Sequence, residues 1–110
     1  MKKDFSRLER IEAQMQTELA LLMQNELADP RIKLVTITGI KVSADLAHAK
    51  VYITVRDDKK LKDILKILKN ASPFLRRLLA RNLQLRKTPE LHFFDDETLR
   101  FAERITQLLK

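Results

Sequence analysis

The sequence of 110 residues contains no cysteine and a single glycine, Gly39. The absence of cysteine excludes disulfide bonds and thiolate chemistry, and it is consistent with a reducing compartment. One glycine is too few for the glycine-rich phosphate loops of nucleotide-binding proteins or for the G-x-S-x-G motif of hydrolases. We therefore expect that the protein is not an enzyme.

Long apolar segments are also missing. The longest apolar run is far below the ~20 residues of a transmembrane helix, and residues 1–5 are not followed by the apolar core of a signal peptide. Hydrophobic residues still make up 45% of the chain, a share typical of globular proteins. We expect one domain, residues 1–110, in the cytoplasm, with no membrane partner.

Acidic residues are outnumbered by basic ones, 15 to 22, which gives a net charge of +7. The excess is concentrated in residues 59–87, where Asp63 is the only acid. Concentrated positive charge favours a polyanionic partner. The residues that we expect to contact the phosphates of such a partner are Lys62, Lys66, Lys69, Arg76, Arg77, Arg81, Arg86 and Lys87.

Hydrophobic periodicity predicts the first half of the fold. Apolar residues at steps of three and four over 5–22 predict a long helix, with Ser6 and Glu9 as its capping box. The β-branched run 34–42 predicts a strand in which Gly39 marks a bulge or a close backbone approach. Residues 47–55 alternate strictly between apolar and polar, so they predict a second, half-buried strand that pairs with the first as a hairpin.

The basic region contains two amphipathic patterns separated by Ala71, Ser72 and Pro73. Ser72 is a favoured N-cap, Pro73 is a favoured first helical residue, and a continuous helix through Pro73 would cost ~3 kcal/mol. We therefore predict two helices with a sharp kink at Ala71–Ser72–Pro73, and Phe74 and Leu75 on the buried side of the second.

Residues 91–94 predict a third strand, and 95–97 begin the last helix, which has an apolar stripe up to Leu109. The predicted order is helix, strand, strand, helix, kink, helix, strand, helix. This is an α+β two-layer sandwich in which the helices cover one face of a three-stranded sheet and water covers the other.

The order of elements and several short motifs resemble the ribosome-binding factor A family over nearly the whole chain. The motifs are Arg7 and Arg10-Ile11, Asp29-Pro30-Arg31, Ser43-x-Asp45-Leu46-x-x-Ala49-x-Val51, Ala71-Ser72, Leu85-Arg86, and Pro89-Glu90-Leu91-x-Phe93. The resemblance implies a type II KH-like fold. It also implies an assembly factor that binds the small (30S) ribosomal subunit and its 16S rRNA and is needed for late rRNA processing. We expect the free protein to be a monomer. No cofactor, metal or small-molecule substrate is implied.

The kink departs from the family pattern. The family usually has Ala-x-Gly there, whereas this chain has Pro73, and it lacks the GxxG loop with which ordinary KH domains clamp RNA. Pro73 should preserve the bend and stiffen it.

Other functions are weaker interpretations of the same residues. The basic face could dock an acidic protein without touching RNA. Tyr52, on the solvent side of its strand, could stack a base, although tyrosine is also simply a good strand residue. A metal site could pair His48 or His92 with Asp45 or Asp95. The acid groups 57–58 and 95–97 could serve a hydrolase or hold a divalent ion. We interpret the histidines as surface residues of strands and the acids as helix caps, because no metal-ligand spacing is present.

Overall fold

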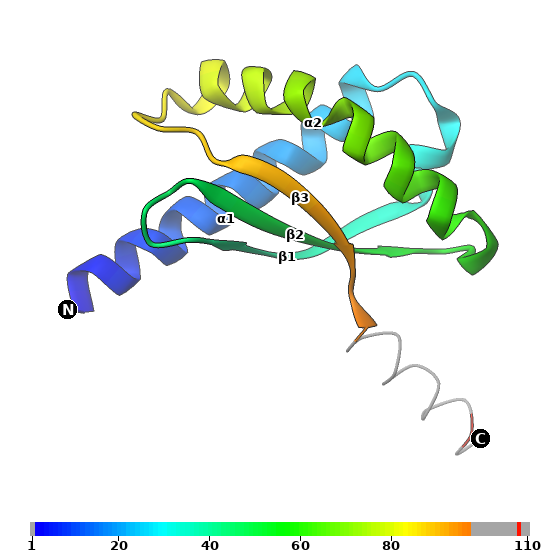
Figure 1. The fold of residues 1–110 in the computed structure, drawn as a ribbon, viewed down its shortest axis with the longest axis horizontal. Helices are drawn as coiled ribbons and strands as arrows, with labels where there is room; N and C mark the ends of the chain where they lie inside the picture. The colour runs from blue at the N-terminus through cyan, green and yellow to red at the C-terminus, as the bar shows by residue number, and fades with distance from the viewer. Residues whose placement is uncertain (1, 98–107, 109–110) are drawn as a thin grey trace.

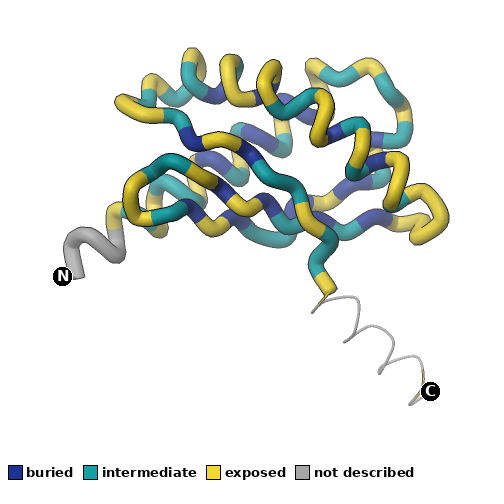
Figure 2. The backbone as a smooth tube through the Cα atoms, viewed as in Figure 1, coloured by how far each residue is buried: buried dark blue, intermediate teal, exposed yellow. Residues whose placement is uncertain are grey.

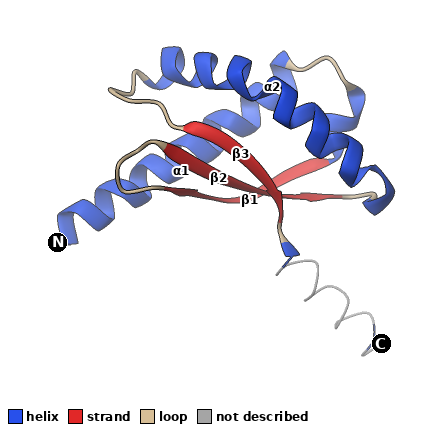
Figure 3. Ribbon diagram, viewed as in Figure 1, coloured by secondary structure: helices blue, strands red, loops and turns tan. Residues whose placement is uncertain are grey.

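The structure is a computed structural model that describes residues 2–97 and 108. Its elements are α1 (Lys2–Glu26), the 3-10 helix η1 (Pro30–Leu34), β1 (Val35–Val42), β2 (His48–Val55), the 3-10 helix η2 (Asp58–Lys60), α2 (Leu61–Leu83) and β3 (Glu90–Asp95). The last helix that we predicted, from residue 95 to Leu109, lies almost entirely outside the described residues. Over the rest of the chain the predicted α+β sandwich is confirmed (Figures 1 and 3).

The three strands form one sheet in the order β1-β2-β3. β1 and β2 are antiparallel, as predicted for a hairpin, and β3 is parallel to β2. A parallel neighbour requires a crossover connection, and α2 supplies it. Both helices pack on one face of the sheet, α1 against β1 and α2 against β3, and they also contact each other.

The core lies between the helices and the sheet (Figure 2). On β2 the predicted alternation is confirmed, because the apolar residues are buried and their neighbours are more exposed. On β1 the predicted bulge is confirmed by a register shift between Ile37 and Gly39. The extra residue returns Ile40 and Val42 to the buried face, where Val35 and Ile37 already lie. A Cβ on Gly39 would meet nothing within 4 Å, so no close approach requires the glycine.

α1 buries the predicted apolar stripe, with Met15, Leu19 and Leu22 in the core. The predicted capping box is wrong, because the helix begins at Lys2 and Ser6 is already helical. Residues 2–5 contain neither glycine nor proline, so nothing in them stops the helix from extending toward the N-terminus.

Two side chains of α1 bond the backbone of the edge strand β1, which we did not predict. Glu12 Oε2 accepts a hydrogen bond from the Val42 amide at 2.8 Å, and Gln16 Nε2 donates one to the Ile37 carbonyl at 3.1 Å. Part of the polar side of α1 therefore hydrogen-bonds the backbone of the sheet and does not face only solvent.

The predicted division of the basic region into two helices is wrong, since α2 continues through Pro73. Ser72 is not an N-cap; its Oγ donates to the Leu68 carbonyl one turn earlier, at 2.9 Å. The reason for continuity is helical phase. Ile64 and Leu75 are eleven residues apart, close to three full turns at 3.6 residues per turn. An unbroken helix therefore presents both to the core, where both are fully buried.

The energies favour the same outcome. Burying Leu75 and Leu79 contributes roughly 1.5–3 kcal/mol each, which together equals or exceeds the ~3 kcal/mol cost of an internal proline. Figure 1 shows α2 changing direction near its middle while remaining helical. A proline, and a serine bonded to the preceding turn, are both known causes of helix bending. Phe74 does not join the core as predicted; it is 37% exposed, because the buried stripe passes through its neighbour Leu75.

Candidate nucleic-acid interface

Three of the predicted lysines form a ridge on α2. Lys62, Lys66 and Lys69 follow one another at steps of four and three, so they share one side of the helix, and all three are exposed. The buried residues Ile64 and Leu68 lie on the opposite side and hold the helix against the sheet. The ridge is thus fixed in orientation by the core beneath it.

Beside this ridge runs a groove between α2 and β3, with a volume of ≈ 370 Å³. Its lining residues are Leu65, Lys66, Lys69 and Ser72 of α2, and Leu91, His92, Phe93 and Phe94 of β3. We call it the α2–β3 groove. The lining contains two ammonium groups and no acid, together with apolar and aromatic surface. Such a groove suits a single-stranded polyanion, whose phosphates meet the lysines while its bases meet apolar walls.

Two other predicted residues take part in the fold. Arg76 donates two hydrogen bonds to the Thr88 carbonyl, from Nε at 3.1 Å and from an Nη at 2.9 Å. Lys87 Nζ donates to the Asp45 carbonyl in the β1–β2 loop at 3.3 Å. Both bonds hold the segment between α2 and β3. Because a guanidinium has five N–H donors, Arg76 keeps capacity for a phosphate.

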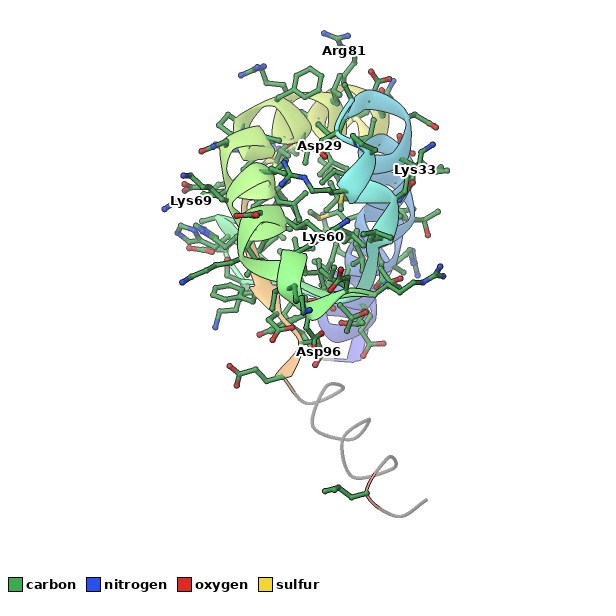
Figure 4. All side chains as sticks on the ribbon, turned by 90° about the vertical axis from the view of Figure 1, so that its right-hand side faces the viewer. Asp29, Lys33, Lys60, Lys69, Arg81 and Asp96 are labelled. Atoms are coloured by element: carbon green, nitrogen blue, oxygen red, sulfur yellow. The ribbon has the colours of Figure 1, made fainter. Side chains whose placement is uncertain are left out.

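The remaining predicted arginines, Arg77, Arg81 and Arg86, are exposed but are not all on the lysine ridge. Twelve residues at 3.6 per turn place Arg81 roughly 120° around the helix from Lys69. Figure 4 agrees, because Lys69 and Arg81 project from the molecule in different directions. The eight predicted residues therefore do not form one flat patch, and the groove brings together only Lys66 and Lys69 among them.

The solvent face of the sheet carries an aromatic pair. The rings of Tyr52 and Phe94 lie 6.0 Å apart between centroids, and Phe94 is 43% exposed. Phe94 also lines the α2–β3 groove. This pairing across β2 and β3 was not predicted. The stacking role considered for Tyr52 stays a prediction.

Several acids that were considered for hydrolysis have structural partners. Asp57 accepts a hydrogen bond from the Lys59 amide as the N-cap of η2, a short 3-10 helix that precedes α2. Asp96 accepts a hydrogen bond from Thr38 Oγ1 at 2.6 Å. Their contacts match the capping and anchoring roles of carboxylates better than acid–base catalysis.

The Asp29-Pro30-Arg31 motif forms a self-contained structure. Asp29 is the N-cap of η1 and accepts the Arg31 amide at 3.0 Å, while the Arg31 guanidinium bonds both of its carboxylate oxygens, at 3.1 and 2.7 Å. These side-chain and backbone hydrogen bonds from Arg31 lower the pKa of Asp29 from 3.8 to about 2. Arg31 also lies 3.7 Å from an Asp63 oxygen, so the motif links η1 to α2.

We predict a pH-dependent stability from this pair. Because the pKa of Asp29 is lower in the folded state, its contribution should be complete above about pH 4 and disappear as the pH falls toward 2. The variant Asp29→Asn keeps a good N-cap and removes the charge. The stability difference between wild type and Asp29→Asn, measured by denaturant unfolding from pH 2 to 6, should follow that window. In an Arg31→Gln background the window should narrow, because only the backbone hydrogen bond from residue 31 then remains. A window of unchanged width would contradict the assignment.

None of the helices in the described part of the chain combines the length and the hydrophobicity of a membrane-spanning segment.

Comparison with known proteins adds independent information. A family model described as "Ribosome-binding factor A" matches residues 7–109. A ribosome-binding factor A from Pseudomonas aeruginosa (strain UCBPP-PA14) is 50% identical over 113 residues, covering 100% of this chain and 88% of the relative. The crystal structure of ribosome-binding factor A from Thermus thermophilus gives a TM-score of 0.73 at 31% identity, over 80% of this chain and 94% of that one. A homology model of the Thermus thermophilus protein, fitted into a cryo-EM map of its complex with the 30S subunit, gives a TM-score of 0.65 at 32% identity, over 77% and 90%.

Proposed function

Because the chain belongs to the ribosome-binding factor A family, we propose that it binds the small (30S) ribosomal subunit through 16S rRNA. It acts as an assembly factor in the cytoplasm, is needed for late processing of that rRNA, and performs no catalysis. The fitted complex of the Thermus thermophilus relative with the 30S subunit supports this proposal.

The observation that carries the proposal is the lysine ridge beside the α2–β3 groove. Lys66 and Lys69 line the groove, and Lys62 continues the ridge one turn away. No ion pair joins these three lysines to the described part of the chain, so their charges are available to phosphates. Phosphate contacts supply affinity with a steep salt dependence, while RNA shape supplies specificity.

The test compares two charge-matched variants. Replacing Lys66 and Lys69 with glutamine should weaken binding and reduce the slope of log K against log salt by about 1.5, because two phosphate contacts are lost. Replacing Lys33 and Lys41, which are also exposed, removes the same charge elsewhere; Figure 4 shows Lys33 on the side opposite Lys69. The slope with this control should stay at the wild-type value. Binding is measured on purified small subunits and on protein-free 16S rRNA.

Each outcome has a definite meaning. If the salt-dependence slope of a folded Lys66/Lys69 variant equals that of wild type, the α2–β3 groove is not part of the RNA interface. Binding to intact subunits together with no binding to protein-free rRNA at low salt would favour the alternative, docking on a ribosomal protein. Substituting the lysines is a sharper test than substituting Arg76. Replacing Arg76 would also break its two hydrogen bonds to the Thr88 carbonyl, so a loss of binding could reflect a change in the fold.

A further inference from the structure

Three metal-ligating side chains converge at one end of the β2–β3 pair, and one of them, His92, also lines the α2–β3 groove. His48 stands opposite Glu90 in the parallel register, and His92 is two residues beyond Glu90, so all three point to the same face of the sheet. His48 Nδ1 lies 3.0 Å from His92 Nε2 and 3.9 Å from a Glu90 carboxylate oxygen. The three ligand atoms all lie within 4.8 Å of one another.

We propose that His48, Glu90 and His92 bind a divalent transition-metal ion, with Zn²⁺ as the reference ion. Two imidazole nitrogens and one carboxylate oxygen are a ligand set that zinc uses, with water completing a tetrahedron. Zinc–ligand bonds of about 2.0–2.1 Å place tetrahedral ligand atoms about 3.3 Å apart. The present separations of 3.0 and 3.9 Å fall on either side of that value, so side-chain rotations without backbone movement complete the site.

The surroundings allow those rotations and an open coordination position. The side chains of His48 and Glu90 are each 58% exposed, so they are not enclosed by the core and solvent reaches the site. Paired strands hold the two histidine backbones in register, which limits the entropy lost on binding. Nitrogen ligands favour Zn²⁺, Ni²⁺ and Cu²⁺ over Mg²⁺, which prefers oxygen. The site is therefore selective for transition metals.

Sequence spacing could not have revealed this site. His48 and His92 are 44 residues apart, and the acids considered near them, Asp45 and Asp95, are not the one that joins them. The parallel pairing of β2 with β3 creates the juxtaposition.

The chain has two histidines and no cysteine, which makes the experiment simple. Untagged protein is titrated with ZnCl₂ by calorimetry, and Co²⁺ serves as a spectroscopic probe. We expect one ion per chain, a rise in Tm with added Zn²⁺, and no comparable response to Mg²⁺. His48→Gln and His92→Gln should each lower the affinity about tenfold or more and abolish the Tm response. Glu90→Gln should also weaken binding.

Glu26→Gln, an exposed acid on α1, is the matched control and should bind like wild type. Circular dichroism confirms that each variant is folded. Absence of zinc binding at millimolar concentration, or binding that is unchanged by both histidine substitutions, would overturn the proposal. The measurements use protein without RNA, so their outcome is independent of the proposed ribosomal function.

Discussion

Leu75→Ala should lower the free energy of unfolding by about 2–5 kcal/mol. Leu75 is fully buried and shares the core with Ile64, Leu68 and Leu79 of the same helix. Truncating its side chain to a methyl group forfeits the burial of the removed atoms and leaves a cavity. A domain of this size has a total stability of roughly 5–15 kcal/mol, so the loss should be a large part of it. Denaturant unfolding with an unchanged m-value measures the effect.

Leu21→Ala is the matched control, because Leu21 is 53% exposed on α1. It should change stability by no more than about 0.5 kcal/mol. If Leu75→Ala cost as little as Leu21→Ala, the helix after Pro73 would not be packed in phase with the helix before it. The comparison therefore tests the continuity of α2 as well as the core.

Pro73→Ala should stabilise the protein by about 2 kcal/mol, the balance of two opposing effects. An internal proline costs a helix ~3 kcal/mol, because it lacks the N–H that would bond the carbonyl of Lys69 and because its ring meets that carbonyl. Alanine restores the bond, but it also makes the unfolded chain more flexible, which returns roughly 0.4–1 kcal/mol. The difference leaves a net gain, which thermal or denaturant unfolding can measure.

Pro30→Ala provides a control of opposite sign. Pro30 occupies the first turn of η1, where a proline fits without losing a hydrogen bond. Its replacement should destabilise by about 0.4–1 kcal/mol through the unfolded chain alone. A Pro73→Ala variant that is neutral or less stable would mean that packing of the bent helix, and not the missing N–H, governs the energetics at this position.

The strands were predictable from the sequence because their signal is local. The alternation over 47–55 needs nothing beyond neighbouring residues, and β2 follows it over His48–Val55. The bulge at Gly39 was also predictable. The hydrogen bond from the inserted residue, Thr38, to Asp96 was not, because these residues are far apart in the sequence.

The continuity of α2 was not predicted because two signals conflict. Ser72 and Pro73 form a strong local start signal for a new helix, whereas the spacing from Ile64 to Leu75 requires one phase throughout. Tertiary burial outweighed the local preference. The sequence contained the decisive observation, namely an apolar stripe that stays in register across the proline.

The candidate site was predictable only in part. Charge concentration pointed to the ridge of Lys62, Lys66 and Lys69, but the groove beside it depends on β3 lying next to α2. Arg76 bonds Thr88 and Arg31 bonds Asp29, so these basic side chains already have partners within the fold. The sequence spacing of the residues does not reveal such contacts.

The contacts of Glu12 and Gln16 with β1 have a consequence for behaviour at high concentration. An outer strand with unsatisfied amides and carbonyls is a template on which another polypeptide can add in β conformation, the first step toward amyloid-like aggregates. Here the N-terminal helix occupies such groups at Val42 and Ile37. A truncation that removes the helix through Glu12 would leave the edge of β1 exposed, with unpaired backbone groups. Such truncated forms should precipitate at concentrations that the full chain tolerates.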